Sequence, residues 1–210
     1  MFNQLSIWEE GNDKSNHQSE KLPMQNAEVI YYQNFFDGNE SNQLFVELYE
    51  TTYWNQESTI VFGKQVKLPR LTAWYGDPGK SYSYSKITMQ PFLWTPVLIN
   101  IKSKIESLSK IKFNSVLLNL YRDGKDSVSW HSDDEPELGE NPVIASVSFG
   151  ANRRFVFRHK IQKELNYEIE LTHGSLLMMK GTTQHFWQHQ IPKKNKLTQS
   201  RINLTFRQIK

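Results

Sequence analysis

The sequence contains no cysteine. Disulfides, iron–sulfur clusters and thiol catalysis are therefore excluded, and any bound metal ion must take its ligands from His, Asp or Glu. The chain also lacks any apolar run near the roughly 18 residues that a membrane span requires, and its first 22 residues lack the apolar stretch of a signal peptide. We therefore expect a cytoplasmic protein that makes no membrane contact.

The sequence also lacks a large excess of either positive or negative residues. The formal net charge of +3 permits a polyanionic partner without requiring one. Of the 210 residues, 38% are hydrophobic, which suits one compact domain with its own core. The sequence shows no repeat and no feature that calls for an oligomer, so we expect a monomer.

Composition divides the chain into a polar tail and a folded domain. Residues 1–21 are rich in Asn, Ser, Gln and charge with little apolar periodicity, and we expect them to be disordered. The folded domain is expected over residues 22–210. Within it, residues 22–112 form an N-terminal extension and residues 113–210 form the core.

Short strands dominate the second half of the chain. Segments such as "NSVLLNLY", "VIASVSFG" and "RINLTFRQI" are apolar, rich in β-branched residues and separated by turns. This pattern is typical of an antiparallel barrel or jelly roll. Upstream, apolar spacing predicts one helix capped by Ser41 and a second that begins at Pro96, with a pair of hairpins between them. The expected fold class is mainly β (α+β).

The first candidate site is a histidine and an aspartate two residues apart in "WHSDDEPELG". Side chains alternate along an extended segment, so His131 and Asp133 point the same way and could bind one cation. A third ligand must come from another strand; the candidates are His159, His173, His185 and His189. His189 is favoured because it follows a buried-looking strand. Two imidazoles and a carboxylate would form the facial triad of a non-haem iron(II) oxygenase, which leaves three positions open for co-substrate and dioxygen.

The last strand supplies a second candidate site. In "RINLTFR", polar and apolar residues alternate, which predicts one core face and one polar face. The polar face carries Arg201, Asn203, Thr205 and Arg207. The two arginines could grip both ends of a small dicarboxylate. Asn119 and Tyr121 share one face of the strand before the His-x-Asp segment, where their donors could bind an oxo-acid that chelates the metal.

Each of these features has a simpler explanation when it is taken alone. The His-x-Asp segment could be a solvated acidic loop, the arginines could lie on a surface edge strand, and Asn119 and Tyr121 could be buried structural residues. The co-occurrence of all three in one chain favours the oxygenase.

Five segments together resemble the AlkB family of iron(II)- and 2-oxoglutarate-dependent nucleic-acid demethylases, in particular its eukaryotic-type homologues. They are "PRLTAWYGD", "NSVLLNLYRDGKDSVSWHSDDEPELG", "IASVSFGANRRFVFRHK", "HGSLLMMKGTTQHFWQH" and "RINLTFRQI". The resemblance runs from about Pro69 to Ile209 and more weakly back to Leu22. It implies a double-stranded β-helix core with a nucleotide-recognition lid in the N-terminal extension.

The resemblance also implies the cofactors and the reaction. Fe(II) is held by His131, Asp133 and His189, and O2 is a co-substrate. The co-substrate 2-oxoglutarate is held by Asn119, Tyr121, Arg201, Asn203 and Arg207. Arg201 lies at the distal carboxylate of 2-oxoglutarate and Arg207 lies nearer the metal. The implied reaction is oxidative demethylation of bases such as 1-methyladenine and 3-methylcytosine in DNA, with RNA as an open alternative, and it releases formaldehyde, succinate and CO2.

Substrate binding requires a pocket for a base that has left its stack. Trp74 and Tyr75 precede a turn, where a lid could place their rings over the barrel mouth. Asp134 and Glu135 adjoin the metal ligands and resemble the base-recognition residues of the family; a solvated acidic turn is the alternative. Weaker candidates, for which strand packing or a solvated charge is the alternative, are Tyr82, Tyr84 and Arg154.

The tail contains a second motif. "NQLSIW" is similar to the pentapeptide with which bacterial repair and replication proteins bind the sliding clamp. The segment in question is Gln4, Leu5, Ser6, Ile7 and Trp8, in which the apolar residues would be the anchors. Two rival functions also remain open: a hydroxylase of the same superfamily that acts on a protein or a small molecule, and a metal-free nucleic-acid-binding module.

Overall fold

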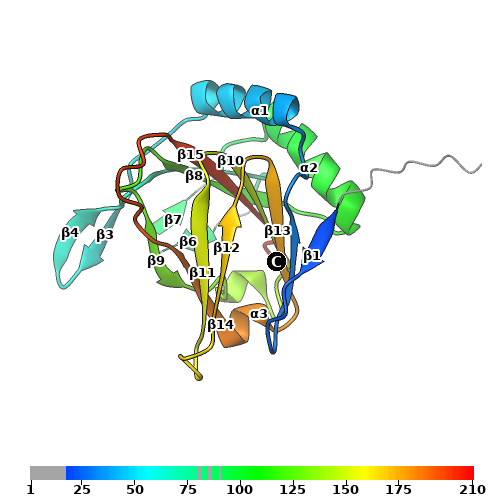
Figure 1. Cartoon of the computed structure of the whole chain (residues 1–210). Helices are drawn as coiled ribbons and strands as arrows, with labels where there is room; N and C mark the ends of the chain where they lie inside the picture. The colour runs from blue at the N-terminus through cyan, green and yellow to red at the C-terminus, as the bar shows by residue number, and fades with distance from the viewer. Residues whose placement is uncertain (1–17, 80–81, 85–86, 90) are drawn as a thin grey trace, which may run out of the picture.

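The computed structural model describes residues 18–79, 82–84, 87–89 and 91–210, and in this part of the chain two antiparallel sheets of seven and four strands form the body. The larger sheet runs in the order β1 (Ser19–Lys21), β2 (Glu28–Tyr32), β13 (Ser175–Lys180), β10 (Ile144–Gly150), β15 (Arg201–Arg207), β8 (Ser115–Tyr121) and β5 (Leu71–Gly76). The smaller sheet runs in the order β12 (Asn166–Leu171), β11 (Arg153–His159), β14 (Trp187–Ile191) and β9 (Val128–His131). The two sheets face each other as a jelly roll, which confirms the predicted fold class (Figure 1).

Two helices cover the outer face of the larger sheet, α1 (Gly38–Thr51) and α2 (Pro96–Ser109) (Figure 1). The second helix begins at Pro96, as predicted, and the Thr95 side chain caps it by accepting the Leu98 N–H. The prediction of a cap at Ser41 is wrong. Asp37 caps α1 instead, because its carboxylate accepts the Glu40 N–H at 2.9 Å.

The core consists of apolar residues on both faces of the larger sheet. On β15, Ile202, Leu204 and Phe206 are fully buried and belong to the cluster beneath the helices. Burial of each such side chain contributes about 1.5–3 kcal/mol. The alternate residues of β15 are also buried, but they are polar and face the smaller sheet. The two-residue period predicted for this strand therefore separates a helix-covered core face from a polar interior.

Shorter elements complete the fold. The hairpins are β3–β4 (Ser58–Val61, Lys64–Lys67) and β6–β7 (Tyr82–Tyr84, Ile87–Met89), and the short helical turns are η1 (Pro136–Leu138) and α3 (Thr183–Phe186). Of the two predicted hairpins, β3–β4 forms where it was expected. The second was expected with its turn at residues 77–79, but β5, which precedes that turn, pairs with β8 instead. Strand β1 lies upstream of Leu22, so ordered structure begins slightly earlier than expected. Within the described ranges, no helix is long and apolar enough to cross a bilayer.

The β3–β4 hairpin projects from the body of the protein (Figure 1). Its turn holds Phe62 and Gly63 with φ of +47° and +76°, as a two-residue hairpin turn of the I′ type requires. Phe62 is fully solvent-exposed, and Ile60 is 77% exposed. The hairpin therefore presents two large apolar side chains to solvent.

Candidate metal centre

Three potential metal ligands meet between β9 and β14. These strands pair in the smaller sheet, and their register places His189 opposite His131. Asp133 follows β9 by two residues. One ligand atom from each of the three side chains lies within 4.8 Å of the others. Of the four histidines considered as third ligand, the structure therefore brings His189 to this site.

Neighbouring groups fix the orientation of the two imidazoles. His131 Nδ1 lies 2.8 Å from the Ser129 carbonyl, which makes Nδ1 the protonated nitrogen and leaves Nε2 as the metal-facing lone pair. The His189 ring stacks on Phe155 with centroids 5.0 Å apart. Both rings are thus held in place by the protein before any ion binds.

Two groups hold Asp133, which is 2% exposed. Its backbone N–H donates to the Gln184 side chain at 2.9 Å, and its carboxylate accepts from Arg207 Nη2 at 2.5 Å. Burial alone would raise the pKa of Asp133, but Arg207 and the two imidazoles outweigh this and lower the pKa to about 2. Asp133 is therefore ionised at neutral pH, as a metal ligand must be.

The pKa of His189 is shifted in the direction that a metal ligand requires. Burial, with a smaller contribution from the nearby His131, lowers the pKa of His189 to about 3, although Asp133 acts in the opposite sense. The imidazole is neutral at physiological pH, so its Nε2 lone pair is available to a cation.

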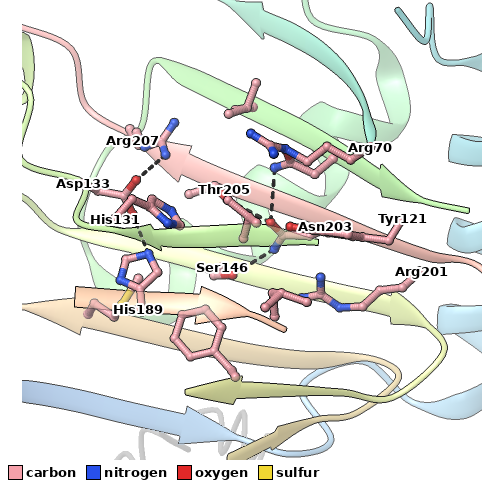
Figure 2. Close-up of a pocket in the computed structure, with 16 residues that line it drawn as sticks. Arg70, Tyr121, His131, Asp133, Ser146, His189, Arg201, Asn203, Thr205 and Arg207 are labelled. Atoms are coloured by element: carbon pink, nitrogen blue, oxygen red, sulfur yellow. Dashed lines mark hydrogen bonds and ion pairs between the residues drawn. The ribbon is translucent and has the colours of Figure 1, made fainter. Parts of the chain in front are cut away.

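Arg201 lies at the opposite end of the same cavity from Arg207 (Figure 2). It is 1% exposed, and its Nη2 donates to Ser148 Oγ at 2.9 Å. Its Nε and Nη1 have no hydrogen-bond partner among the described residues. Burial lowers the pKa of Arg201 to about 10. A buried guanidinium with two open N–H groups is a site for an anion, and a carboxylate matches its geometry.

Amide and hydroxyl groups line the cavity between the two arginines (Figure 2). Asn119 Nδ2 lies 3.4 Å from Asn203 Oδ1, and Asn203 Nδ2 donates to Ser146 Oγ at 2.9 Å. The ring of Tyr121 lies 5.2 Å from the Arg201 guanidinium. The structure thus collects all five residues predicted to hold 2-oxoglutarate in one cavity with the three metal-ligand candidates.

Arg70 is a cavity residue that the sequence reasoning missed. It is 4% exposed, and its Nε donates to Asn119 Oδ1 at 2.9 Å. Arg70 precedes β5, and the register of β5 against β8 sets Thr72 opposite Asn119. Since that register is a tertiary feature, no local pattern around Arg70 indicated its position.

The donor set fits the expected cofactors. Two imidazoles and one carboxylate match the ligands of non-haem Fe(II), and the open N–H groups of Arg201 match the distal carboxylate of an oxo-acid. Arg207, which contacts the metal-site carboxylate, lies at the metal end of the cavity, as the resemblance implied.

The two acidic residues after Asp133 differ in their surroundings. Asp134 is exposed, and its carboxylate accepts from Lys160 Nζ at 2.9 Å. Glu135 is half-buried, and its Oε2 is buried without a hydrogen-bond partner among the described residues. Of the two carboxylates, Glu135 therefore has the greater capacity to bind a new donor or cation.

Trp74 and Tyr75 do not lie on a lid. Both belong to β5 and are 3% and 1% exposed, so the expectation that a loop carries them over the barrel mouth is wrong. Their side chains point to opposite faces of the sheet. Trp74 shares a face with Leu117 of the metal cavity, whereas Tyr75 packs in the cluster beneath the helices. A role in base binding stays a prediction for Trp74, and the position of Tyr75 argues against one.

Of the remaining substrate candidates, only Arg154 has a described side chain, and it does not line the cavity. Arg154 lies on the exposed face of β11 and forms an ion pair with Glu168, whereas Phe155, the next residue, faces the cavity. The Arg154 side chain therefore points away from the cavity, and a role in substrate binding stays a prediction. Tyr82 and Tyr84 belong to β6, but their side chains lie outside the described part of the structure, as does the segment Gln4, Leu5, Ser6, Ile7 and Trp8.

Comparison with known proteins shows which family the chain belongs to. The chain matches the model of the "2OG-Fe(II) oxygenase superfamily" over residues 28–207. It is 47% identical to "Alpha-ketoglutarate-dependent dioxygenase alkB homolog 3" of Mus musculus over 192 residues, which cover 87% of this chain and 66% of that protein. It is 42% identical to "DNA oxidative demethylase ALKBH2" of Homo sapiens over 188 residues, which cover 85% of this chain and 72% of that protein.

A solved structure shows the same fold. The chain described as "The structure of OsALKBH1" matches with a TM-score of 0.63 at 16% identity, over 86% of this chain and 96% of that one. The similarity at this level concerns the fold alone. The chain spans slightly less than two thirds, 66%, of the length of the mouse relative.

Proposed function

Because the chain belongs to the 2OG-Fe(II) oxygenase superfamily and, within it, to the AlkB family, we propose that it removes N-alkyl groups from nucleic-acid bases in an Fe(II)- and 2-oxoglutarate-dependent reaction. The observation that carries the proposal is the single cavity that joins the His131, Asp133 and His189 group to a buried arginine with open N–H groups. A metal-free binding module would have no use for either feature.

Each group of the cavity has a defined task in this reaction. His131, Asp133 and His189 would hold Fe(II) from one side, so that the opposite side stays open for co-substrate and dioxygen. Arg201 would bind the distal carboxylate of 2-oxoglutarate, and Arg207 would hold Asp133 in place. When bound, iron and 2-oxoglutarate would use dioxygen to hydroxylate an N-methyl group, which is then lost as formaldehyde while succinate and CO2 are released.

The substrate class follows from the groups around the cavity. A methyl group on a stacked base could not reach a metal inside the jelly roll, so the base must leave its stack. Bases such as 1-methyladenine and 3-methylcytosine are cationic, and a carboxylate favours them over their neutral parents. We assign this selection to Glu135, which is not among the residues that line the cavity but follows Asp133 by two residues and has one buried oxygen without a partner among the described residues.

The β3–β4 hairpin supports contact with a nucleic-acid strand. Its tip exposes Phe62 beside the exposed Lys64, and Lys67 is exposed at its base. Apolar side chains can insert between bases, and lysines bind phosphates. We propose DNA as the substrate, with RNA as the alternative. We further propose that the tail binds a sliding clamp and that the protein is a cytoplasmic monomer.

Demethylation of a synthetic oligonucleotide tests the proposal. We expect loss of the methyl group from an oligonucleotide that contains 1-methyladenine, detected by mass spectrometry, only when both Fe(II) and 2-oxoglutarate are present. Formaldehyde and succinate should appear in equal amounts. The unmethylated oligonucleotide is the control. The rival function, a hydroxylase of proteins or small molecules, would be indicated by iron-dependent succinate formation without any demethylated base.

A further inference from the structure

The segment that carries Asp133 lies where the pairing of two strands ends. Strand β9 ends at His131, which pairs with His189 of β14. In an antiparallel pair, each step forward on one strand is one step back on the other, so a continuation of this register sets Asp133 opposite Trp187. Trp187 is the first residue of β14, because the chain before it forms α3 (Figure 1). Asp133 therefore lies beyond β9, at the end of the ladder.

A side chain of α3 provides the hydrogen bond that the ladder does not. Gln184 is fully buried, and its Oε1 accepts the Asp133 N–H at 2.9 Å. The other end of the same amide, Nε2, lies 3.6 Å from Met179 Sδ, and a thioether sulfur is a weak acceptor. The bond to Asp133 is thus the stronger of these two contacts.

Two further contacts hold the residues on either side of the aspartate. Ser132 Oγ donates to the Trp187 carbonyl at 3.0 Å. Lys160 Nζ donates to the Gln184 carbonyl at 2.8 Å and to the Asp134 carboxylate at 2.9 Å. The whole segment is therefore fixed against α3 and the start of β14.

The position of the Asp133 backbone decides where its carboxylate lies. Arg207 contacts one carboxylate oxygen at the far end of the side chain, whereas Gln184 holds the backbone from which the side chain starts. A metal site requires ligand distances within about 0.2 Å of their ideal values. A small shift of the backbone at Asp133 would exceed that tolerance, even with the contact to Arg207 intact.

We propose that Gln184 is a positioning residue of the metal site. Its Oε1 fixes the backbone of Asp133 and so holds the Asp133 carboxylate where it can bind one metal ion together with His131 and His189. The inference rests on the proposed function, because it requires a metal ion at this site. Gln184 acts through Asp133 and is not itself a ligand. The loss of such a hydrogen bond to a metal ligand typically weakens metal binding by about 10- to 100-fold.

A titration of Q184M with Co(II) tests the proposal without turnover. Methionine keeps the unbranched shape and much of the volume of glutamine, but it removes the acceptor of the Asp133 N–H. We expect Co(II), followed by its visible absorption, to bind Q184M about 10- to 100-fold more weakly than the wild-type protein. Each titration is performed well below the melting temperature of the variant, so that only folded protein is compared.

Two matched variants separate the hydrogen bond from the loss of an amide. Q184E keeps an oxygen at the position of Oε1, and we expect it to bind Co(II) no more than about threefold more weakly than the wild-type protein. Q190M makes the methionine replacement on β14, one residue after His189, where strand alternation turns the half-buried side chain away from the cavity. Q190M should leave the affinity for Co(II) unchanged.

Equal affinity of Q184M and the wild-type protein for Co(II) would overturn the role of Gln184. The role would also be overturned if Q184E bound Co(II) as weakly as Q184M, since the acceptor oxygen would then not be the group that matters. A wild-type protein that binds no Co(II) would instead refute the metal site on which the proposed function depends.

Discussion

Replacement of His131 with alanine should eliminate demethylation, with kcat/KM at least about 1000-fold below that of the wild-type protein. A bound metal ion contributes several kcal/mol of transition-state stabilisation, and each 1.36 kcal/mol corresponds to a factor of ten in rate. Removal of His131 leaves one imidazole and one carboxylate, which cannot form a facial triad. Turnover of the 1-methyladenine oligonucleotide under saturating Fe(II) measures the effect.

His131 is the best of the three ligands for this test because its removal disturbs the fold least. It is half-buried, and its ring contacts the Ser129 carbonyl. Loss of Asp133 would instead leave the buried Arg207 without its carboxylate, which costs about 3–5 kcal/mol of stability. H185A, an exposed histidine of α3, is the matched control and should keep full activity. Activity of H131A within tenfold of the wild-type value would contradict the assigned ligand.

Replacement of Arg201 with methionine should raise the KM for 2-oxoglutarate by about 30- to 1000-fold, because removal of one partner from a buried charge pair costs about 2–4 kcal/mol of binding. Methionine retains much of the apolar volume but removes every N–H donor. Fe(II) binding should persist, since Arg201 lies at the end of the cavity opposite the metal ligands (Figure 2). Initial rates at varied 2-oxoglutarate concentration give the KM.

The stability of R201M provides a second readout. In the ligand-free protein, burial disfavours the charged form of Arg201 and lowers its pKa to about 10, so removal of this charge should not lower the melting temperature. R154M replaces an exposed arginine on the outer face of β11 and should leave the KM for 2-oxoglutarate unchanged. An unaltered KM in R201M would show that the distal carboxylate binds elsewhere.

Strand alternation explains why much of the site could be predicted. The period of two in β15 separates Arg201 and Arg207 from the apolar core face, and the same period places His131 and Asp133 on one side of an extended segment. These are local properties of the chain. The fold class followed in the same way, from short apolar segments separated by turns.

Features that depend on pairing between distant strands could not be predicted locally. His189 becomes a ligand candidate through the register of β14 against β9, and Arg70 enters the cavity through the register of β5 against β8. The error over Trp74 and Tyr75 has the same origin. Both precede a turn, which suggested a lid, but their strand pairs with β8 and becomes part of the larger sheet.

An anaerobic Fe(II) titration tests the central claim most directly, because it requires no substrate and no turnover. The claim is that His131, Asp133 and His189, which the fold brings within 4.8 Å of one another, bind one ferrous ion. We expect the wild-type protein to bind one Fe(II) per chain, with visible charge-transfer absorption when 2-oxoglutarate is added, and we expect H189A to lose both signals while it remains folded. Equal Fe(II) binding by the wild-type protein and H189A, or no Fe(II) binding by the wild-type protein, would contradict the account.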